Sequence, residues 1–181
     1  MIVICYGLPG TGKTTVGRAI AGRLNCPLLS TDEIRKQLID KPRYTREERE
    51  LIYKVIFLLI EFAQRHLPNV VLDGTFTESK LREDVAELAR RLGAEFYFIK
   101  CVCDEQTVLS RIRNRTDSFS DATEETYFHL REHWEAGVLP HFELDTTESI
   151  DDNVRTVMQF LSASKDKRES SALPFTGGES E

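Results

Sequence analysis

The sequence predicts an α/β fold in which a parallel β-sheet is covered by helices on both faces. Three observations support this prediction. Apolar, strand-like runs alternate with helical segments up to about residue 163, an order typical of a parallel sheet with crossover helices. The first run, Ile2–Tyr6, is apolar throughout, as expected of a strand that is buried on both faces. A glycine-rich turn follows it directly and leads into a helical segment at Lys13.

In the first half of the chain, capping residues and a proline mark where the elements end. The expected elements are a strand at residues 2–6, a helix at 13–24, a short strand at 27–30, a helix from residue 31 to the Lys41-Pro42 step, and a helix at 45–66. Ser30 or Thr31 is the expected N-cap, and a proline cannot continue a helix. The middle of the last helix, residues 55–60, is apolar nearly all round. We therefore expect this helix to be well buried.

The second half continues the alternation and ends in a polar segment. The expected elements are a strand at residues 70–73, a helix at 78–92 that stops at Gly93, a strand at 96–102, a helix at 105–113, an irregular segment at 114–121, a helix at 124–135, a weak strand at 142–144 and a helix at 150–161. From about Ser164 the sequence is rich in serine, glycine and charge, which indicates a disordered tail or a cloning remnant. We predict one domain at residues 1–163 and a tail at 164–181.

Composition indicates a compact domain that binds neither membranes nor structural metals. The chain has 181 residues, of which 40% are hydrophobic and 30% charged, enough for one domain with its own core. No signal peptide precedes the first strand, and no apolar run reaches the roughly 18 residues of a membrane span, so we expect a cytoplasmic protein. The net charge of −6 disfavours broad affinity for nucleic acid. The four cysteines lack the spacing of a disulfide or zinc framework and are interpreted as small apolar residues in a reducing compartment.

The segment Gly7-Leu8-Pro9-Gly10-Thr11-Gly12-Lys13-Thr14 matches the phosphate-binding loop pattern G-x-x-x-x-G-K-[ST]. It lies between a strand and a helix, where backbone N–H groups converge on a phosphate at the helix N-terminus. Lys13 can reach the β- and γ-phosphates, and the Thr14 hydroxyl can bind Mg²⁺. We therefore predict ATP and Mg²⁺ as cofactors. The predicted nucleotide-binding residues here are Leu8, Pro9, Gly10, Thr11, Gly12, Lys13, Thr14 and Thr15.

Two aspartates follow strands of the predicted sheet. Asp73 ends the run Val70-Val71-Leu72-Asp73, where a carboxylate can support a Mg²⁺-bound water and the Thr14 hydroxyl; the alternative is an aspartate that caps a turn. Asp32 comes just after the second strand, at the sheet edge where ligands bind in α/β folds. It is a candidate base for an acceptor hydroxyl. Arg35 lies one helical turn further on, so the alternative for Asp32 is a local ion pair.

Three arginines, Arg111, Arg113 and Arg115, precede a polar segment at residues 116–120. Arginines at the base of a mobile segment can close over a triphosphate and stabilise charge in the transition state. A spacing of four residues would place Arg111 and Arg115 on one helical face, so we predict that these two contact the nucleotide. The alternative is a solvated basic face that pairs with the acidic residues at 124 and 125.

Together, the loop at residues 7–15, the Asp32-x-x-Arg35 pair, the strand end Asp73-Gly74-Thr75 and the Arg111-x-x-x-Arg115 pair resemble the small P-loop kinases. The most similar group is that of the AAA-type ATP-binding proteins, which are related to polynucleotide 5′-kinases, zeta toxins and gluconate kinases. The resemblance covers about residues 1–163. It implies a P-loop NTPase fold with five parallel strands in the order 2-3-1-4-5, and an adenine contact near residues 145–147.

The resemblance also implies roles for individual residues. In polynucleotide kinases the aspartate matching Asp32 is the general base, the arginine matching Arg35 helps to hold the acceptor end, and a lid arginine matches Arg115. This chain has Asp73-Gly74-Thr75-Phe76 where those kinases carry Asp-x-Thr-Asn, which argues against a nucleic-acid acceptor. The Glu-Gly-Thr of zeta toxins is more similar, although their substrate-binding inserts are not evident in this sequence.

We predict a kinase that transfers the γ-phosphoryl group of ATP to a hydroxyl of a small molecule, a nucleotide or a nucleic-acid end, the last being disfavoured by charge. Its catalytic residues would be Lys13, Asp32 and Arg115, with Arg35 binding the substrate and with Thr14 and Asp73 at the metal. The alternative is a nucleotide switch or motor that hydrolyses ATP with water as the acceptor. Asp32 on the acceptor side favours the kinase, as does a chain too short for an oligomer-forming helical lid. The sequence identifies neither the acceptor nor the oligomeric state.

Overall fold

The computed structural model describes residues 1–116 and 119–171, and within them a five-stranded, wholly parallel sheet. The strands are β1 (Ile2–Tyr6), β2 (Leu28–Ser30), β3 (Val70–Gly74), β4 (Phe96–Val102) and β5 (Phe142–Asp145). The helices are α1 (Lys13–Leu24), α2 (Thr31–Leu38), α3 (Arg46–His66), α4 (Ser79–Arg91), α5 (Glu105–Arg113), α6 (Glu124–Glu132) and α7 (Ile150–Ser171). The strand order is β2-β3-β1-β4-β5, which confirms the predicted fold class and order.

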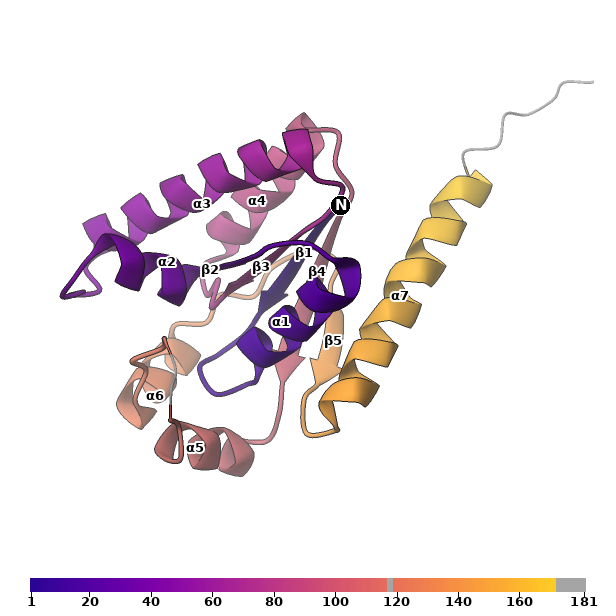
Figure 1. The fold of residues 1–181 in the computed structure, drawn as a ribbon. Coiled ribbons are helices and arrows are strands. Elements are labelled where there is room, and N and C mark those ends of the chain that lie inside the picture. The colour runs from indigo at the N-terminus through magenta and orange to yellow at the C-terminus, as the bar shows by residue number, and fades with distance from the viewer. Residues whose placement is uncertain (117–118, 172–181) are drawn as a thin grey trace, which may run out of the picture.

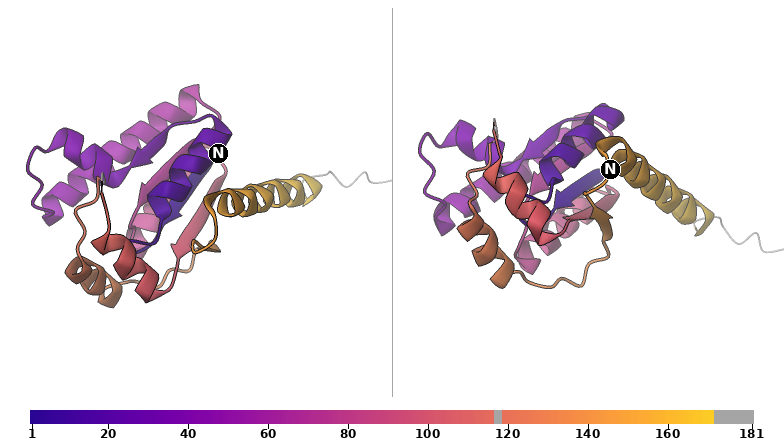
Figure 2. Two further views of the ribbon diagram at one scale, coloured as in Figure 1. Left: turned by 60° about the horizontal axis from the view of Figure 1, so that its bottom comes forward. Right: turned by 90° about the horizontal axis from the view of Figure 1, so that it is seen from below.

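Helices cover both faces of the sheet. Figures 1 and 2 show α1 and α7 on one side and α3 and α4 on the other, while α5 and α6 lie beyond the ends of the strands. Because successive residues of a strand face opposite ways, β1 contributes to two cores. Ile2, Ile4 and Tyr6 pack with α3 and α4. Val3 and Cys5 pack with α1 and α7. All five residues of β1 are buried, which explains why this strand is apolar throughout.

The register of the central strands sets the position of the polar residues at their ends. Cys5 of β1 lies beside Asp73 of β3, and Asp73 in turn lies beside Ser30 of β2. The loop after β1 therefore begins level with the last residues of β2 and β3. In a parallel sheet all these ends share one edge, which is the edge used for ligand binding in open α/β folds.

The boundaries of several elements differ from those predicted. β2 begins one residue later than expected, at Leu28, and α6 ends at Glu132 rather than at residue 135. Helix α7 continues to Ser171, ten residues beyond the expected end. The segment predicted to be a tail, residues 164–181, is thus helical up to Ser171, and its remainder lies outside the described residues. A polar, charged helix end has little apolar periodicity, so its length was hard to predict.

The prediction that α3 is well buried is only half right. Ile52, Ile56 and Ile60 are completely buried against the sheet. Leu58, by contrast, is 66% exposed, although it lies in the apolar run of residues 55–60. One face of α3 covers the sheet, and the opposite face carries apolar side chains that no described element covers.

Two further observations concern the cysteines and the possibility of a membrane-spanning helix. All four cysteines are free thiols, and Cys5 and Cys101 are buried. This agrees with their interpretation as small apolar residues. Among the described helices, none is both long enough and apolar enough to cross a lipid bilayer.

We expect Ile56→Ala to lower the free energy of unfolding by about 2–5 kcal/mol, since it leaves a cavity between α3 and the sheet. The matched control is Val138→Ala, at a site that is 90% exposed, which should change stability by less than about 0.5 kcal/mol. Urea unfolding of the two variants measures both values. Equal effects at the two sites would contradict the packing of α3 described above.

Candidate functional site

The phosphate loop, residues 7–14, joins β1 to α1 and has the backbone conformation that its glycines permit. Gly10 and Gly12 have φ angles of 81° and 79°, in the left-handed region that other residues rarely adopt. A Cβ at Gly10 would also lie 2.9 Å from the Val108 side chain. Gly12 is the N-cap of α1, and among the described residues no side chain caps this helix. Its first N–H groups therefore remain available to a phosphate, which the helix dipole also attracts.

Lys13 is the first residue of α1, and its side chain is turned back along the loop. The residue is only 8% exposed, and its ammonium group donates a weak hydrogen bond to the carbonyl oxygen of Leu8, at 3.4 Å. Its charge also lowers the pKa of Asp73, in opposition to the effect of burial. A largely buried ammonium group beside free helix N–H groups is well suited to bind phosphate oxygens.

Asp73 connects three elements at the edge of the sheet. Its Oδ2 atom accepts hydrogen bonds from the hydroxyl groups of Thr14 on α1, at 2.6 Å, and Ser30 on β2, at 3.0 Å. The residue is 3% exposed, and burial raises the pKa of its carboxyl group above the usual value. The two hydroxyl groups and Lys13 act in the opposite direction. The predicted proximity of Asp73 and Thr14 is therefore present in the structure.

The other oxygen of Asp73, Oδ1, is buried and has no hydrogen-bond partner among the described residues. Such a group usually has a water or an ion as its partner. Mg²⁺ keeps several waters and binds through one or two carboxylates plus substrate phosphates. A threonine hydroxyl and a neighbouring carboxylate at a phosphate loop fit that ion. The described residues contain no cluster of three or more His, Cys, Asp or Glu, so an all-protein metal cage is absent from this part of the chain.

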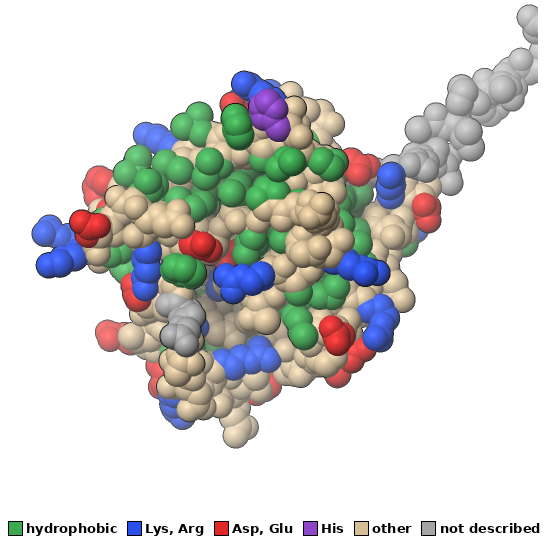
Figure 3. Space-filling view, viewed as in Figure 1, with side chains coloured by type: hydrophobic (Ala, Val, Ile, Leu, Met, Phe, Trp, Pro, Cys, Tyr) green, Lys and Arg blue, Asp and Glu red, His purple; other side chains and the backbone are tan. Residues whose placement is uncertain are grey.

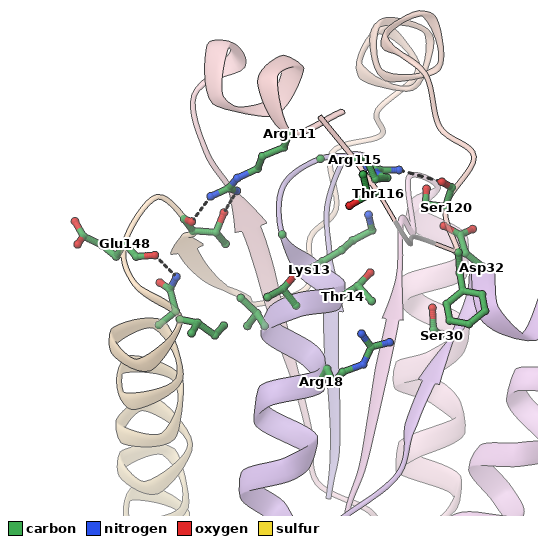
Figure 4. Close-up of a pocket in the computed structure, with 18 residues that line it drawn as sticks. Lys13, Thr14, Arg18, Ser30, Asp32, Arg111, Arg115, Thr116, Ser120 and Glu148 are labelled. Carbon is green, nitrogen blue, oxygen red and sulfur yellow. Dashed lines mark hydrogen bonds between the residues drawn. The ribbon is translucent and has the colours of Figure 1, made fainter. Parts of the chain in front are cut away.

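A cavity of about 540 Å³ extends from the phosphate loop in two directions. On one side lie Ser30 and Asp32, at the end of β2 and the start of α2, and on the other lie Arg111 and Glu148 (Figure 4). Lys13 and Thr14 lie between the two sides. The Asp32 carboxylate makes no hydrogen bond or ion pair with any residue that the structure describes. It is therefore free to accept a proton or a hydrogen bond from a bound molecule.

Arg111 is held by the loop that follows β5. Its guanidinium group donates to the hydroxyl group of Thr146, at 3.0 Å, and to the carbonyl oxygen of Thr146, at 2.7 Å. The Thr146 hydroxyl in turn donates to the carbonyl oxygen of Thr11 in the phosphate loop, at 2.8 Å. This chain of bonds fixes the phosphate loop, α5 and the β5–α7 loop relative to one another. Thr146 belongs to the segment expected to approach the adenine, and it lines the cavity.

The argument that placed Arg111 and Arg115 on one helical face is wrong, because α5 ends at Arg113. Both arginines nevertheless line the cavity. Arg115 lies in the loop after α5 and donates to the carbonyl oxygen of Ser120, at 3.2 Å. Arg113 points elsewhere and pairs with Glu124, as the solvated-face alternative proposed. The predicted lid segment includes residues 117–118, which lie outside the described residues.

Arg35 is not among the residues that line the cavity, and it forms no ion pair with Asp32 within the described structure. Its side chain is directed toward α3 and the segment before it. The guanidinium group lies 3.8 Å from Glu48 and packs over the ring of Tyr44, 4.9 Å from its centroid. Arg35 is 7% exposed, and its Nε and Nη1 atoms have no hydrogen-bond partner. Arg35 is thus a buried cation with unused donors that lies outside the cavity.

Three residues predicted to bind the nucleotide, Leu8, Pro9 and Thr11, belong to the loop without lining the cavity. Sequence reasoning missed several residues that do line it, namely Arg18, Ser30, Thr116, Phe119, Ser120, Glu148, Ile150 and Asn153. Two of these carried a usable signal. Arg18 follows Thr14 by four residues and so lies on the same face of α1. Ser30 ends a parallel strand at the ligand edge of the sheet. The others come from loops whose course the sequence did not indicate.

Comparisons with known proteins identify relatives of this chain. A family model described as an AAA domain matches residues 2–136. An uncharacterized protein of Mycobacterium tuberculosis is 26% identical over 136 residues, which cover 68% of this chain and 27% of that protein. A shikimate kinase of Corynebacterium diphtheriae is 46% identical over 41 residues, 23% of this chain and 24% of that enzyme. The matched segments thus cover only about a quarter of the length of each of these curated relatives.

Two solved structures show the same fold. A gluconokinase from Sinorhizobium meliloti 1021 superposes with a TM-score of 0.70 at 21% identity, covering 95% of this chain and 97% of that one. The APS kinase of Mycobacterium tuberculosis in complex with AMPPNP and APS gives a TM-score of 0.68 at 17% identity, covering 89% of this chain and 96% of that one. At these identities the likeness establishes the fold, and it confirms that the chain is similar to small P-loop kinases.

We expect Asp73→Asn to preserve the fold but to abolish stabilisation by Mg²⁺ in the presence of ATP. The asparagine carbonyl oxygen can still accept from Thr14 or Ser30, and the variant no longer carries the cost of a buried charge. The melting temperature of the ligand-free variant should therefore match or exceed that of the wild type.

Melting curves with ATP alone and with ATP plus Mg²⁺ measure this effect. Ser30→Ala is the matched control, because it removes one hydrogen bond to the same oxygen and leaves the carboxylate in place. It should keep the Mg²⁺-dependent rise in melting temperature. A full rise in Asp73→Asn would show that Asp73 takes no part in binding the metal.

Proposed function

Since the chain belongs to the AAA domain family, we propose that it is a Mg²⁺-dependent kinase that transfers the γ-phosphoryl group of ATP to a hydroxyl group of a small molecule. One observation carries the proposal. The Asp32 carboxylate shares a cavity with Lys13 and Thr14, and it has no hydrogen-bond or ion-pair partner among the described residues. Phosphoryl transfer needs a carboxylate in this position, to accept the proton of the attacking hydroxyl.

The phosphate loop and the arginines would bind and neutralise the triphosphate. The N–H groups at the start of α1 and the Lys13 ammonium group would hold the β- and γ-phosphates. Arg115 would stabilise charge on the transferring group, as preorganised cations do in active sites. Arg111 already donates to Thr146, so its role would be to shape the nucleotide end of the cavity and to offer its charge there.

Thr14 and Asp73 would hold the metal, Thr14 through its hydroxyl group and Asp73 through a metal-bound water. Mg²⁺ bridges phosphate oxygens and neutralises the charge that develops on them. The free Oδ1 atom of Asp73 and the short bond from Thr14 to Oδ2 support this assignment. Both residues belong to elements with regular structure, which favours precise placement.

Asp32 would orient the acceptor and take its proton. It is the second residue of α2, directly after β2, so the rigid end of the sheet positions it. Ser30 and Arg18 line the same part of the cavity and offer a hydroxyl group and a positive charge to the acceptor. Arg35 does not line the cavity, so its buried positive charge would act on the acceptor at a distance and not by contact. The positive charges of Arg18 and Arg35 favour an acceptor that carries a phosphate or carboxylate group.

Two considerations favour a small molecule over a nucleic-acid end. The net charge of −6 opposes binding to a polyanion. Structural neighbours of this chain include a gluconokinase and an APS kinase, and a shikimate kinase matches part of its sequence. We propose residues 1–163 as the kinase domain. Because the match covers only 27% of the Mycobacterium tuberculosis protein, the proposed activity is that of this chain and is not extended to the whole of that relative.

The test begins with a search for the acceptor. Release of ADP is measured with and without a panel of sugars, sugar acids, nucleosides and 5′-hydroxyl oligonucleotides. Stimulation by one class, with formation of its phosphate ester, would identify the acceptor. A rate that no acceptor changes would favour the ATP-hydrolysing switch instead.

With the acceptor in hand, we expect Asp32→Asn to lower kcat by about 10²–10⁴-fold while the affinity for ATP stays nearly constant. The substitution keeps the shape of the side chain and removes the proton acceptor. Glu33→Gln is the matched control, because Glu33 is the next residue of α2 and does not line the cavity. It should leave kcat unchanged. Wild-type turnover by Asp32→Asn would refute the role of Asp32 as the base.

A further inference from the structure

Helix α3 exposes a row of large apolar side chains. Leu51 is 49% exposed, Leu58 66%, Leu59 36% and Phe62 64%. The opposite face of the same helix contributes Ile52, Ile56 and Ile60 to the core. Figure 3 shows hydrophobic side chains gathered over α3 on the face that it presents. We call the four exposed residues the α3 stripe.

Such a stripe is unusual for a helix that lies on the outside of a sheet. A surface helix normally has one apolar face toward the core and charged residues on the other. Leu51, Leu58 and Phe62 are separated by seven and four residues, which places them on one side of the helix. Contiguous exposed apolar residues of this kind mark interaction surfaces. None of them lines the cavity, so their exposure is not explained by the proposed reaction.

The stripe is arranged so that a second copy of α3 fits it in the antiparallel direction. The helix runs from Arg46 to His66, and the stripe from Leu51 to Phe62 is centred close to the middle of the helix. When an identical helix is turned end for end, Leu51 of one copy lies beside Phe62 of the other. Leu58 lies near the axis that relates the two. A two-fold contact of this type uses the same patch twice.

The charges at the two ends of α3 favour the same arrangement. On the side of the stripe, Glu47 precedes Leu51 by four residues and Arg65 follows Leu58 by seven, so the two charges flank the stripe at opposite ends. An antiparallel copy brings Glu47 of one chain near Arg65 of the other, whereas a parallel copy would place each beside its own kind. Glu50 pairs with Arg46 on the exposed surface, an interaction weak enough to rearrange. Arg65 has no ion-pair partner in the described part of the chain.

We propose that this chain forms a two-fold dimer in which the α3 helices of two copies pack antiparallel through the α3 stripe. The pairing buries Leu51, Leu58, Leu59 and Phe62 and leaves the cavity open, because no residue of α3 lines it. A contact between two helices about 31 Å long, at 1.5 Å per residue, is small for an interface. The dimer is therefore in exchange with the monomer. The proposal is independent of the kinase activity.

Sedimentation equilibrium over a wide range of protein concentration tests the dimer. The wild type should show a reversible monomer–dimer equilibrium. Leu58→Asp places a charge at the centre of the contact and should weaken the dimer at least about tenfold. Val138→Asp is the control, since Val138 is 90% exposed and lies outside α3. A wild type that stays monomeric at every concentration, or a dimer that Leu58→Asp does not weaken, would overturn the proposal.

Cross-linking with a short bismaleimide tests the direction of the helices. Leu58→Cys chains should cross-link to each other, because residue 58 lies near the two-fold axis. Leu51→Cys and Phe62→Cys chains should cross-link only when mixed, since residues 51 and 62 are about 16 Å apart along the helix. The wild type, with its four native cysteines, gives the background. Cross-linking of Leu51→Cys chains alone would indicate parallel helices and contradict the proposal.

Discussion

The hydrogen bonds to the Asp73 carboxylate are the interaction on which the site depends. One oxygen accepts from Thr14 on α1 and from Ser30 on β2, so the phosphate loop is tied to the two strands that end beside it. This becomes possible because Ser30, Asp73 and Cys5 are level in the parallel register. The same burial that raises the pKa of Asp73 leaves its second oxygen without a partner among the described residues. That oxygen can accept a hydrogen bond from a water molecule bound to a metal ion.

A second set of contacts shapes the side of the cavity that we propose for the nucleotide. Arg111, Thr146 and the Thr11 carbonyl connect α5, the loop after β5 and the phosphate loop. The side that we propose for the acceptor is built differently, from Asp32 at the start of α2. Arg35, one turn further along α2, is buried outside the cavity and contacts the segment before α3. On the side of the cavity proposed for the nucleotide, Arg111 and Thr146 therefore already have hydrogen-bond partners within the chain. On the other side the Asp32 carboxylate has no partner among the described residues, and such a group can be satisfied by a bound molecule.

The sequence was sufficient for the features that depend on local pattern. The strand Ile2–Tyr6, the loop after it and the proximity of Thr14 to Asp73 all follow from short motifs with fixed geometry. The sequence was insufficient where contacts with residues distant in the chain determine the exposure or direction of a side chain. The apolar run at residues 55–60 could not reveal that Leu58 faces outward, because no sequence rule shows which face the sheet covers. Arg35 was expected beside Asp32, yet packing against Tyr44 and Glu48 directs it elsewhere.

The destination of the γ-phosphoryl group tests the central claim most directly. The reaction is run with ATP and the identified acceptor in water enriched in ¹⁸O, and the phosphate products are analysed by mass spectrometry. Attack by an acceptor hydroxyl puts no solvent oxygen into the product, whereas attack by water puts one into inorganic phosphate. The account predicts an unlabelled phosphate ester formed in step with ADP. ADP matched entirely by ¹⁸O-labelled inorganic phosphate, whichever acceptor is added, would contradict it.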